Sequence, residues 1–274
     1  MYQNILNLPE IIENIFKYLP KDQLEDLCVD REFGTPALIA LRKYKLHTND
    51  DKLLYTDREI RHLQFNYKKG QDLITRFYNL RSLDVSCVYI YSQTLVDITK
   101  LSNLKILIIY RTRLNFKDII EITKMNSLKH LNISWNELKF RESVEIAKMT
   151  NLTSLHIGGN HLGSDGTAEI AKMTNLRSLN ILRNKLKFKG VTEIAKMGNL
   201  RELNISQNNL NYRSAIEIAK MRGLTTLNIS RNQLKSQGAA EIAKMMRLTT
   251  LRILCNDLND SDKSLFGHIR NVTF

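Results

Sequence analysis

The chain has 274 residues with 43% apolar residues, and its 41 Lys and Arg residues against 28 Asp and Glu residues give a net charge of +13. One or two domains with a large core fit this size. No apolar run approaches the roughly 18 residues of a membrane span, and three widely spaced cysteines argue against a disulfide framework and indicate a reducing compartment.

The first ten residues lack the basic and long apolar regions of a secretory signal. We therefore expect a cytoplasmic or nuclear location. The charge is unevenly spread, because residues 1–50 carry 6 Lys and Arg against 8 Asp and Glu, whereas the remainder carries 35 against 20. A basic surface favours acidic partners, whether protein, nucleic acid or anionic lipid.

Residues 1–42 predict three short helices. Apolar residues recur at helical spacing over Leu8–Leu19, and the proline that follows ends this helix. A sequence similar to a capping box opens a second helix over Asp22–Val29, and a Thr-Pro pair opens a third over Thr35–Leu41. Three such helices make a poor free-standing core, so we expect this segment to lean on a neighbour or a partner.

The segment Leu-Pro-Glu-Ile-Ile-x-x-Ile-Phe-x-Tyr-Leu at Leu8–Leu19 resembles the opening of an F-box, and the resemblance extends over about 35 residues. In that family the motif docks on the Skp-type adaptor of a cullin–RING ubiquitin ligase. The resemblance implies an adaptor-facing surface formed by Leu8, Pro9, Ile12 and Phe16. The alternative is a helical cap that seals the exposed edge of the first repeat, which solenoids require.

One pattern repeats every 24 residues between Leu128 and Leu258, with the form L-x-x-L-x-I-x-x-N-x-L. Such a period marks a leucine-rich repeat solenoid. Within each unit, apolar residues two apart predict a short strand with one inward face. The return segment Ser143–Lys148, rich in Glu, Ile, Ala and Lys, suits a short outer helix. The Glu and Lys pairs of these segments, such as Glu145 and Lys148, are expected on a solvated face.

The predicted fold class is α/β, a solenoid with a curved parallel sheet inside and short helices outside, preceded by the small helical F-box-like domain at 1–42. We take 43–59 as a junction, 60–258 as about nine repeats of which the first are irregular, and 259–274 as a C-terminal cap. Leu265, Phe266 and Ile269 are expected to cover the last repeat.

The segment Gly-x-Asp-Gly-Thr-Ala-Glu-Ile-Ala at 163–171 resembles the GALA-type branch of the ribonuclease-inhibitor-like repeats. That branch is known in F-box proteins, so this resemblance supports the F-box reading of the first helix.

An asparagine follows each strand of the regular repeats, and these residues form a ladder at Asn136, Asn160, Asn184, Asn208, Asn232 and Asn256. An unsatisfied buried amide costs about 1–3 kcal/mol, so we expect the side chains to bond to the backbone of the turn, in preference to forming a track for a ligand. Four aromatic residues precede the outer helices and are predicted to pack as staples against them, at Phe116, Phe140, Phe188 and Tyr212.

Strand residues that point away from the core should line the inner curve. Most are small or polar, including a second row of asparagines at Asn132, Asn180, Asn204 and Asn228. The larger side chains are the candidate partner-binding residues, namely Tyr110, Arg111, Trp135, Arg183, Arg231 and Arg252. Trp, Tyr and Arg are the residue types most enriched at interface hot spots. The alternative for Trp135 is that it only shields the edge of the ladder, since single exposed aromatic residues are common.

The sequence contains no nucleophile motif, phosphate loop or metal-ligand spacing, so we predict no enzymatic activity, no metal and no cofactor. The leading hypothesis is a substrate-recognition subunit of an F-box-type cullin–RING ligase, with a Skp-type adaptor and an acidic or phosphorylated protein target as partners, and no membrane. A scaffold, effector or inhibitor without a ligase is the alternative. Nucleic-acid binding ranks last, because no recognised module is present.

Overall fold

The computed structural model of the chain describes four ranges, 27–28, 62–65, 80–87 and 89–274. It forms two compact units, Met1–Arg113 and Leu114–Phe274. The F-box-like segment at Leu8–Leu19 and the junction at 43–59 lie outside the described residues, so both stay predictions.

The described part of the first unit consists of four strands and one helix. They are β1 (Leu27–Cys28), β2 (His62–Phe65), β3 (Ser82–Asp84), α3 (Ser92–Thr99) and β4 (Ile106–Ile108). Strands β2, β3 and β4 are parallel, with Leu63, Leu83 and Leu107 in register. The irregular first repeats therefore form the strands that their leucines predict.

The second helix predicted over Asp22–Val29 is wrong where the structure describes it. Leu27 and Cys28 form β1, which pairs antiparallel with Phe65 and Gln64 of β2. The edge of a sheet presents unpaired N–H and C=O groups. Pairing them with β1 satisfies that edge, and this gain outweighs a weak local helix preference.

The second unit repeats one strand and one helix. Its strands are β5 (His130–Asn132), β6 (Ser154–His156), β7 (Ser178–Asn180), β8 (Glu202–Asn204), β9 (Thr226–Asn228), β10 (Thr250–Arg252) and β11 (Asn271–Thr273). Its helices are α4 (Phe116–Thr123), α5 (Phe140–Ile146), α6 (Gly163–Ile170), α7 (Lys187–Ile194), α8 (Tyr212–Ala219), α9 (Lys235–Ile242) and the 3-10 helix η3 (Asp260–Phe266).

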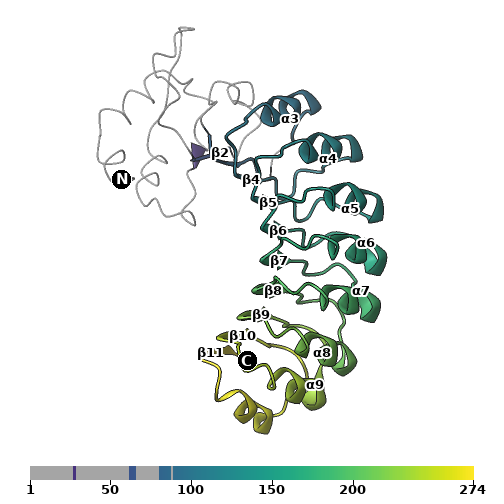
Figure 1. The fold of residues 1–274 in the computed structure, drawn as a ribbon, viewed down its shortest axis with the longest axis vertical. Helices are drawn as coiled ribbons and strands as arrows, with labels where there is room; N and C mark the ends of the chain where they lie inside the picture. Colours follow the sequence, from purple (N-terminus) through teal and green to yellow (C-terminus); the bar gives the residue numbers. More distant parts are fainter. Residues whose placement is uncertain (1–26, 29–61, 66–79, 88) are drawn as a thin grey trace, which may run out of the picture. The chain divides into compact units, whose positions relative to one another are not determined.

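Within this unit the strands are parallel neighbours along one side and the helices lie along the other (Figure 1). The predicted inward residues are buried between the two layers, with Leu131 2% and Ile133 0% exposed on the strand, and Ile146 1% and Met149 7% exposed on the return. The helices begin earlier than predicted, since α5 starts at Phe140. The Glu–Lys pairs lie at their ends with the lysine exposed and the glutamate half-buried, and 2.7 Å separates Lys148 Nζ from Glu145 Oε2.

The asparagine ladder forms as predicted and uses both ends of each amide. Asn208 Nδ2 donates to the carbonyls of Ile205 (3.1 Å) in its own turn and Ile181 (3.2 Å) in the preceding turn. Its Oδ1 accepts from the backbone N–H groups of Asn184 (2.8 Å) and Leu186 (3.4 Å). Asn208 therefore links two successive turns, and its own amide is satisfied by backbone. At Asn256 only the donor end is engaged, because its buried Oδ1 has no partner among the described residues.

The predicted aromatic staples are wrong in part. The four residues lie in the first turns of α4, α5, α7 and α8. Phe140, Phe188 and Tyr212 are 49%, 48% and 39% exposed, so they do not pack fully against the core. Phe116 instead lies under the guanidinium of Arg141, which is 3.5 Å from the ring centroid. Helices that begin earlier than predicted carry these rings at the outer rim.

The C-terminal segment caps the last repeat, with one residue placed differently from the prediction. Phe266 and Ile269 are 1% and 6% exposed, but Leu265 is 39% exposed. The segment also adds a strand that the leucine pattern did not indicate, because β11 pairs in parallel with β10. This strand satisfies the edge of β10 as a further repeat would.

The two ends of the ladder amide can be tested separately. In Asn208→Ala two buried N–H groups and the carbonyls of the turn lose partners, so we expect the free energy of unfolding to fall by about 3 kcal/mol. Asn256→Ala is the matched control, because the buried Asn256 Oδ1 accepts no hydrogen bond from any residue that the structure describes. Chemical denaturation followed by circular dichroism should show a clearly smaller loss for it. Equal losses of unfolding free energy in the two variants would mean that the hydrogen bonds accepted by Oδ1 contribute nothing to stability.

Candidate partner-binding face

The residue before each ladder asparagine forms a row at the end of the strands, which we call the turn column. In the second unit it consists of Trp135, Gly159, Arg183, Gln207, Arg231 and Cys255, all with φ between 49° and 65°. The backbone N–H of the first five donates to a carbonyl of the next repeat, at 2.7–3.0 Å. Because the backbone holds the turn, the side chains of this column are free to vary.

Trp135, Gly159 and Arg183 form one composite surface. A Cβ atom added to Gly159 would overlap the indole of Trp135, so the ring lies directly over the glycine backbone. The guanidinium of Arg183 lies beyond the glycine, 5.0 Å from the centre of the Trp135 ring. A cation over an exposed indole contributes about 0.5–1 kcal/mol. Two of the predicted binding residues are thus brought together, although 48 positions separate them in the chain.

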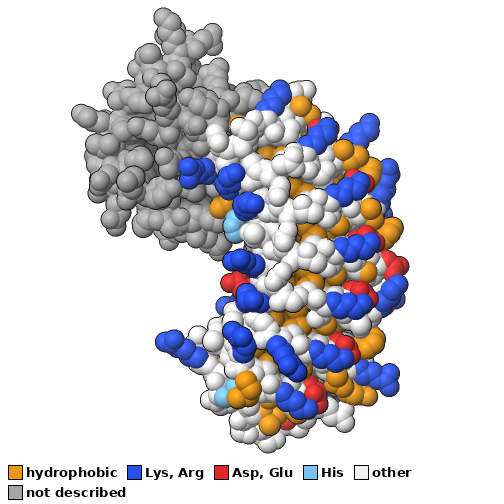
Figure 2. Space-filling view, in the orientation of Figure 1, with side chains coloured by type: hydrophobic (Ala, Val, Ile, Leu, Met, Phe, Trp, Pro, Cys, Tyr) orange, Lys and Arg blue, Asp and Glu red, His pale blue; other side chains and the backbone are white. Residues whose placement is uncertain are grey.

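The remaining predicted arginines of the second unit stand near this row. Arg231 lies in the turn column, and Arg252 ends β10, in register with Asn228 of β9. Arg183, Arg231 and Arg252 are exposed, and within the described residues none of them has an ion-pair partner. Glu202 is the only acidic residue in strands β5 to β11. Figure 2 shows Lys and Arg side chains along the strand side of this unit, with few acidic groups between them.

The second row of asparagines supplies further hydrogen-bond donors. Asn132, Asn204 and Asn228 each use Oδ1 to accept from the N–H two residues on, at 3.1, 3.2 and 3.1 Å, and Asn180 does the same at 3.3 Å. These bonds fix the amide orientation. No acceptor among the described residues takes the Nδ2 group of these four asparagines, so their N–H donors are directed to solvent or a partner.

The positive charge of this face comes from arginine and lysine. Burial lowers the pKa of His130 below its usual value. Arginine keeps its charge at every physiological pH. Binding through this face should therefore weaken as the salt concentration rises.

Tyr110 and Arg111 belong to the first unit. Arg111 is exposed and has φ 54°, the same turn conformation as the column residues of the second unit, and the Tyr110 carbonyl accepts from the N–H of Cys87 at 2.8 Å. They follow β4 as Trp135 follows β5. Their part in the same partner contact stays a prediction.

This arrangement offers donors and one aromatic surface to an acceptor-rich partner. Guanidinium groups and unpaired amide N–H groups match carboxylates or phosphates. Within the described ranges there is no group of three or more His, Cys, Asp or Glu residues that could hold a metal ion. Among the same residues, every helix is too short or too polar to cross a membrane.

Two family models and one solved structure agree with the repeat fold. A model of Zer-1-like leucine-rich repeats matches residues 71–193, and a general leucine-rich repeat model matches residues 174–234. The structure of an internalin, inlF, from Listeria monocytogenes is similar, with a TM-score of 0.58 and 18% identity over 79% of this chain and 68% of that chain. A second internalin from the same organism, inlC2, gives a TM-score of 0.41 and 18% identity over 73% of each chain. The comparison with curated proteins gave no match.

The predicted leucine-rich repeat solenoid is therefore confirmed. The more specific GALA-type resemblance is not supported by these matches and stays a prediction. Sequence reasoning missed the role of Gly159, although the only signal for it was present: a glycine where neighbouring repeats carry Trp135 and Arg183. It also treated the second asparagine row as neutral lining, whereas the row supplies aligned donors.

The contact of the indole with Gly159 can be tested by a double-mutant cycle. Gly159→Ala should displace the ring, because the new methyl group occupies its place, and should cost about 1 kcal/mol more in wild type than in a Trp135→Ala background. Trp135 is the only tryptophan, so its fluorescence emission should also shift to longer wavelength. Equal costs in both backgrounds would show that the ring does not rest on the glycine.

Proposed function

We propose that this chain is a substrate-recognition subunit of an F-box-type cullin–RING ubiquitin ligase, in which the strand face of the repeats binds an acidic or phosphorylated protein. Ubiquitin transfer belongs to other subunits. The proposal has two parts, a partner-binding face and a link to a Skp-type adaptor, and they rest on different observations.

The face is supported by one observation above the others. Trp135 and Arg183 stack together beside arginines that have no acidic partner within the described residues. A desolvated pair of Trp and Arg is a typical hot spot. Unmatched guanidinium groups and amide donors favour a partner rich in carboxylates or phosphates. The adaptor link is supported by the F-box-like residues Leu8, Pro9, Ile12 and Phe16.

A scaffold, effector or inhibitor without a ligase is the second candidate, and one observation favours it. Strand β1 pairs with β2, so Leu27 and Cys28, which lie inside the F-box-like segment 1–42, extend the sheet of the first repeats. A segment that only seals the first repeat would do the same. Both candidates share the partner-binding face and differ in the role of residues 1–42.

Charge reversal tests the face. Arg183→Glu with Arg231→Glu should weaken target binding at least about ten-fold, since like charges now oppose an acidic partner. Lys148→Glu with Lys196→Glu is the matched control, because it changes net charge equally on the helix side. Pull-down from native extract with quantitative mass spectrometry, before and after phosphatase treatment, measures both. An equal loss of target binding in the two variants would mean that only net charge matters, and it would contradict a binding site on the strand face.

Phe16→Glu tests the adaptor link on the full chain. If the F-box-like helix docks on a Skp-type adaptor, the adaptor should co-purify with wild type and be lost from Phe16→Glu, while targets that depend on Arg183 are retained. A chain that captures targets but never the adaptor would leave the scaffold candidate standing. Retention of the adaptor by Phe16→Glu would contradict the assigned surface.

A further inference from the structure

A second ladder of asparagines runs along the opposite rim, where each helix returns to the next strand. Asn151, Asn175 and Asn199 donate through Nδ2 to the carbonyls of Asn126, Thr150 and Thr174, at 2.9, 2.8 and 2.9 Å. Each amide thus fills the gap between two successive repeats. The 24-residue spacing places the next two members at 223 and 247, where the chain has Gly223 and Arg247.

Another side chain replaces the missing asparagine at only one of these two positions. At the first step Arg201 takes the place of the missing amide, with its Nη1 donating to the carbonyl of Gly198 at 3.3 Å. A side chain at Gly223 would collide with this guanidinium. At the second step no donor among the described residues reaches the carbonyl of Arg222, which an asparagine at position 247 would have bonded.

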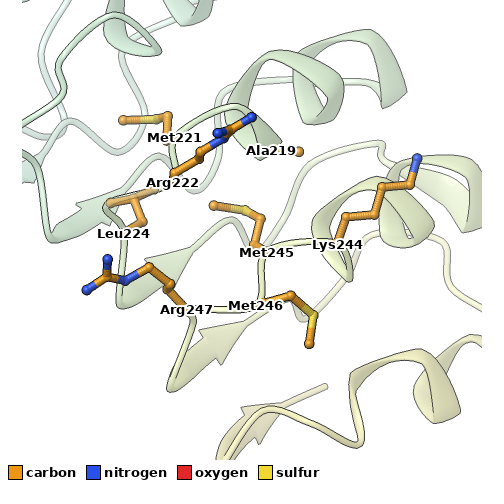
Figure 3. Close-up of a pocket in the computed structure, with 8 residues that line it drawn as sticks. All are labelled: Ala219, Met221, Arg222, Leu224, Lys244, Met245, Met246 and Arg247. Atoms are coloured by element: carbon orange, nitrogen blue, oxygen red, sulfur yellow. The ribbon is translucent and has the colours of Figure 1, made fainter.

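A pocket of about 310 Å³ opens where this ladder stops. It lies between the return of α8 and the return of α9 and is formed by residues 219–224 and 244–247. In Figure 3 the Arg222 side chain lies above Met245, that of Arg247 extends away at the lower left, and Met246 lies below. The lining thus combines apolar side chains with two arginines.

The charges around this pocket are unbalanced. The nearby carboxylates are already engaged, because Glu217 pairs with Lys220 and Glu241 pairs with Lys244, each at 2.7 Å. Within the part of the chain that the structure describes, Arg222 and Arg247 have no ion-pair partner. Two exposed cations beside apolar lining residues therefore remain available to an anionic group.

Met246 is the most exposed large apolar residue of the described chain, at 74%. The equivalent positions of the earlier repeats carry Thr150, Thr174, Gly198 and Arg222, none of which is a large apolar residue. Methionine is flexible and polarisable and is frequent at adaptable binding surfaces. Within the described repeats, an exposed Met beside two arginines without ion-pair partners thus occurs in the repeat that lacks the ladder asparagine.

We propose that this pocket is a second binding site, separate from the strand face, for a short acidic peptide segment in which an apolar side chain is flanked by carboxylates. The apolar side chain packs on Met245 and Met246. The flanking carboxylates bond to the guanidinium groups of Arg222 and Arg247. A backbone N–H of the peptide donates to the carbonyl of Arg222, in place of the missing asparagine.

The sequence of an intact earlier repeat supplies the variant that should remove this site. Met246→Thr with Arg247→Asn copies Thr150-Asn151 of an intact step, removes the exposed apolar group and one cation, and returns an amide to the carbonyl of Arg222. Because it rebuilds the ladder, its thermal midpoint should equal or exceed that of wild type. Loss of peptide binding in this variant cannot then be assigned to unfolding.

The probe is a fluorescein-labelled, end-blocked peptide, Glu-Asp-Leu-Phe-Asp-Glu, measured by anisotropy against the full chain. We expect saturable binding to wild type, at least about ten-fold weaker binding to the double variant, and unchanged binding to Arg183→Ala with Arg231→Ala. The emission of Trp135 should not change, because that residue lies several repeats away in the turn column.

Four results would overturn the proposal. Three of them are no binding of the peptide to wild type, equal binding to the double variant, and loss of binding in the Arg183 and Arg231 variant. The fourth is displacement of the peptide by single-stranded DNA together with equal binding of a peptide whose Leu and Phe are replaced by Ser. The last would assign the pocket to a polyanion that needs no apolar group. Failure of the strand-face proposal leaves this test intact, since its variants and its fluorescence readout are separate.

Discussion

The repeat architecture depends on a buried amide that has to satisfy two turns at once. Asn208 donates to carbonyls of its own turn and the preceding one, and accepts from the N–H groups of the preceding turn. Removing either turn would leave buried polar groups without partners, so a single repeat is not a stable unit. The ladder fixes how successive turns align, because an insertion in the strand or the turn would carry the amide out of reach of its acceptor. Leucine burial supplies the driving force, and the ladder fixes the register.

The features that recur at this period could be predicted from the sequence. Leucine and isoleucine at alternate strand positions and an asparagine three residues after the isoleucine define the strand, the turn and the buried face. Features that occur once could not. Strand β11 has no leucine pattern, and it forms because the edge of β10 needs a partner. Strand β1 likewise depends on the exposed edge of β2 and overrides the local helical pattern around Leu27.

The sequence predicted which residues belong to the candidate binding face, but not the contacts that they make. Trp135 and Arg183 stood out by residue type, but their stacking depends on the bare backbone of Gly159 between them, which a list of large residues does not include. The second asparagine row was visible, but its donor character follows only when Oδ1 is seen to be engaged. The ladder on the opposite rim shows the same limit: Asn151, Asn175 and Asn199 were readable at the right spacing, and only their partners show what the departures at Gly223 and Arg247 leave open.

The left-handed backbone of the turn column has a consequence for how such a protein can change. Tryptophan, glycine, arginine, glutamine and cysteine all occupy it with φ between 49° and 65°, and the N–H that holds the turn belongs to the main chain. Apart from Gly159, which the indole of Trp135 covers, side-chain identity at these sites is thus largely uncoupled from folding. A residue other than glycine carries only a modest strain of about 1 kcal/mol there. The residues of the turn column can be substituted one repeat at a time, so a repeat protein of this kind can change its binding partner while its thermal midpoint stays nearly constant.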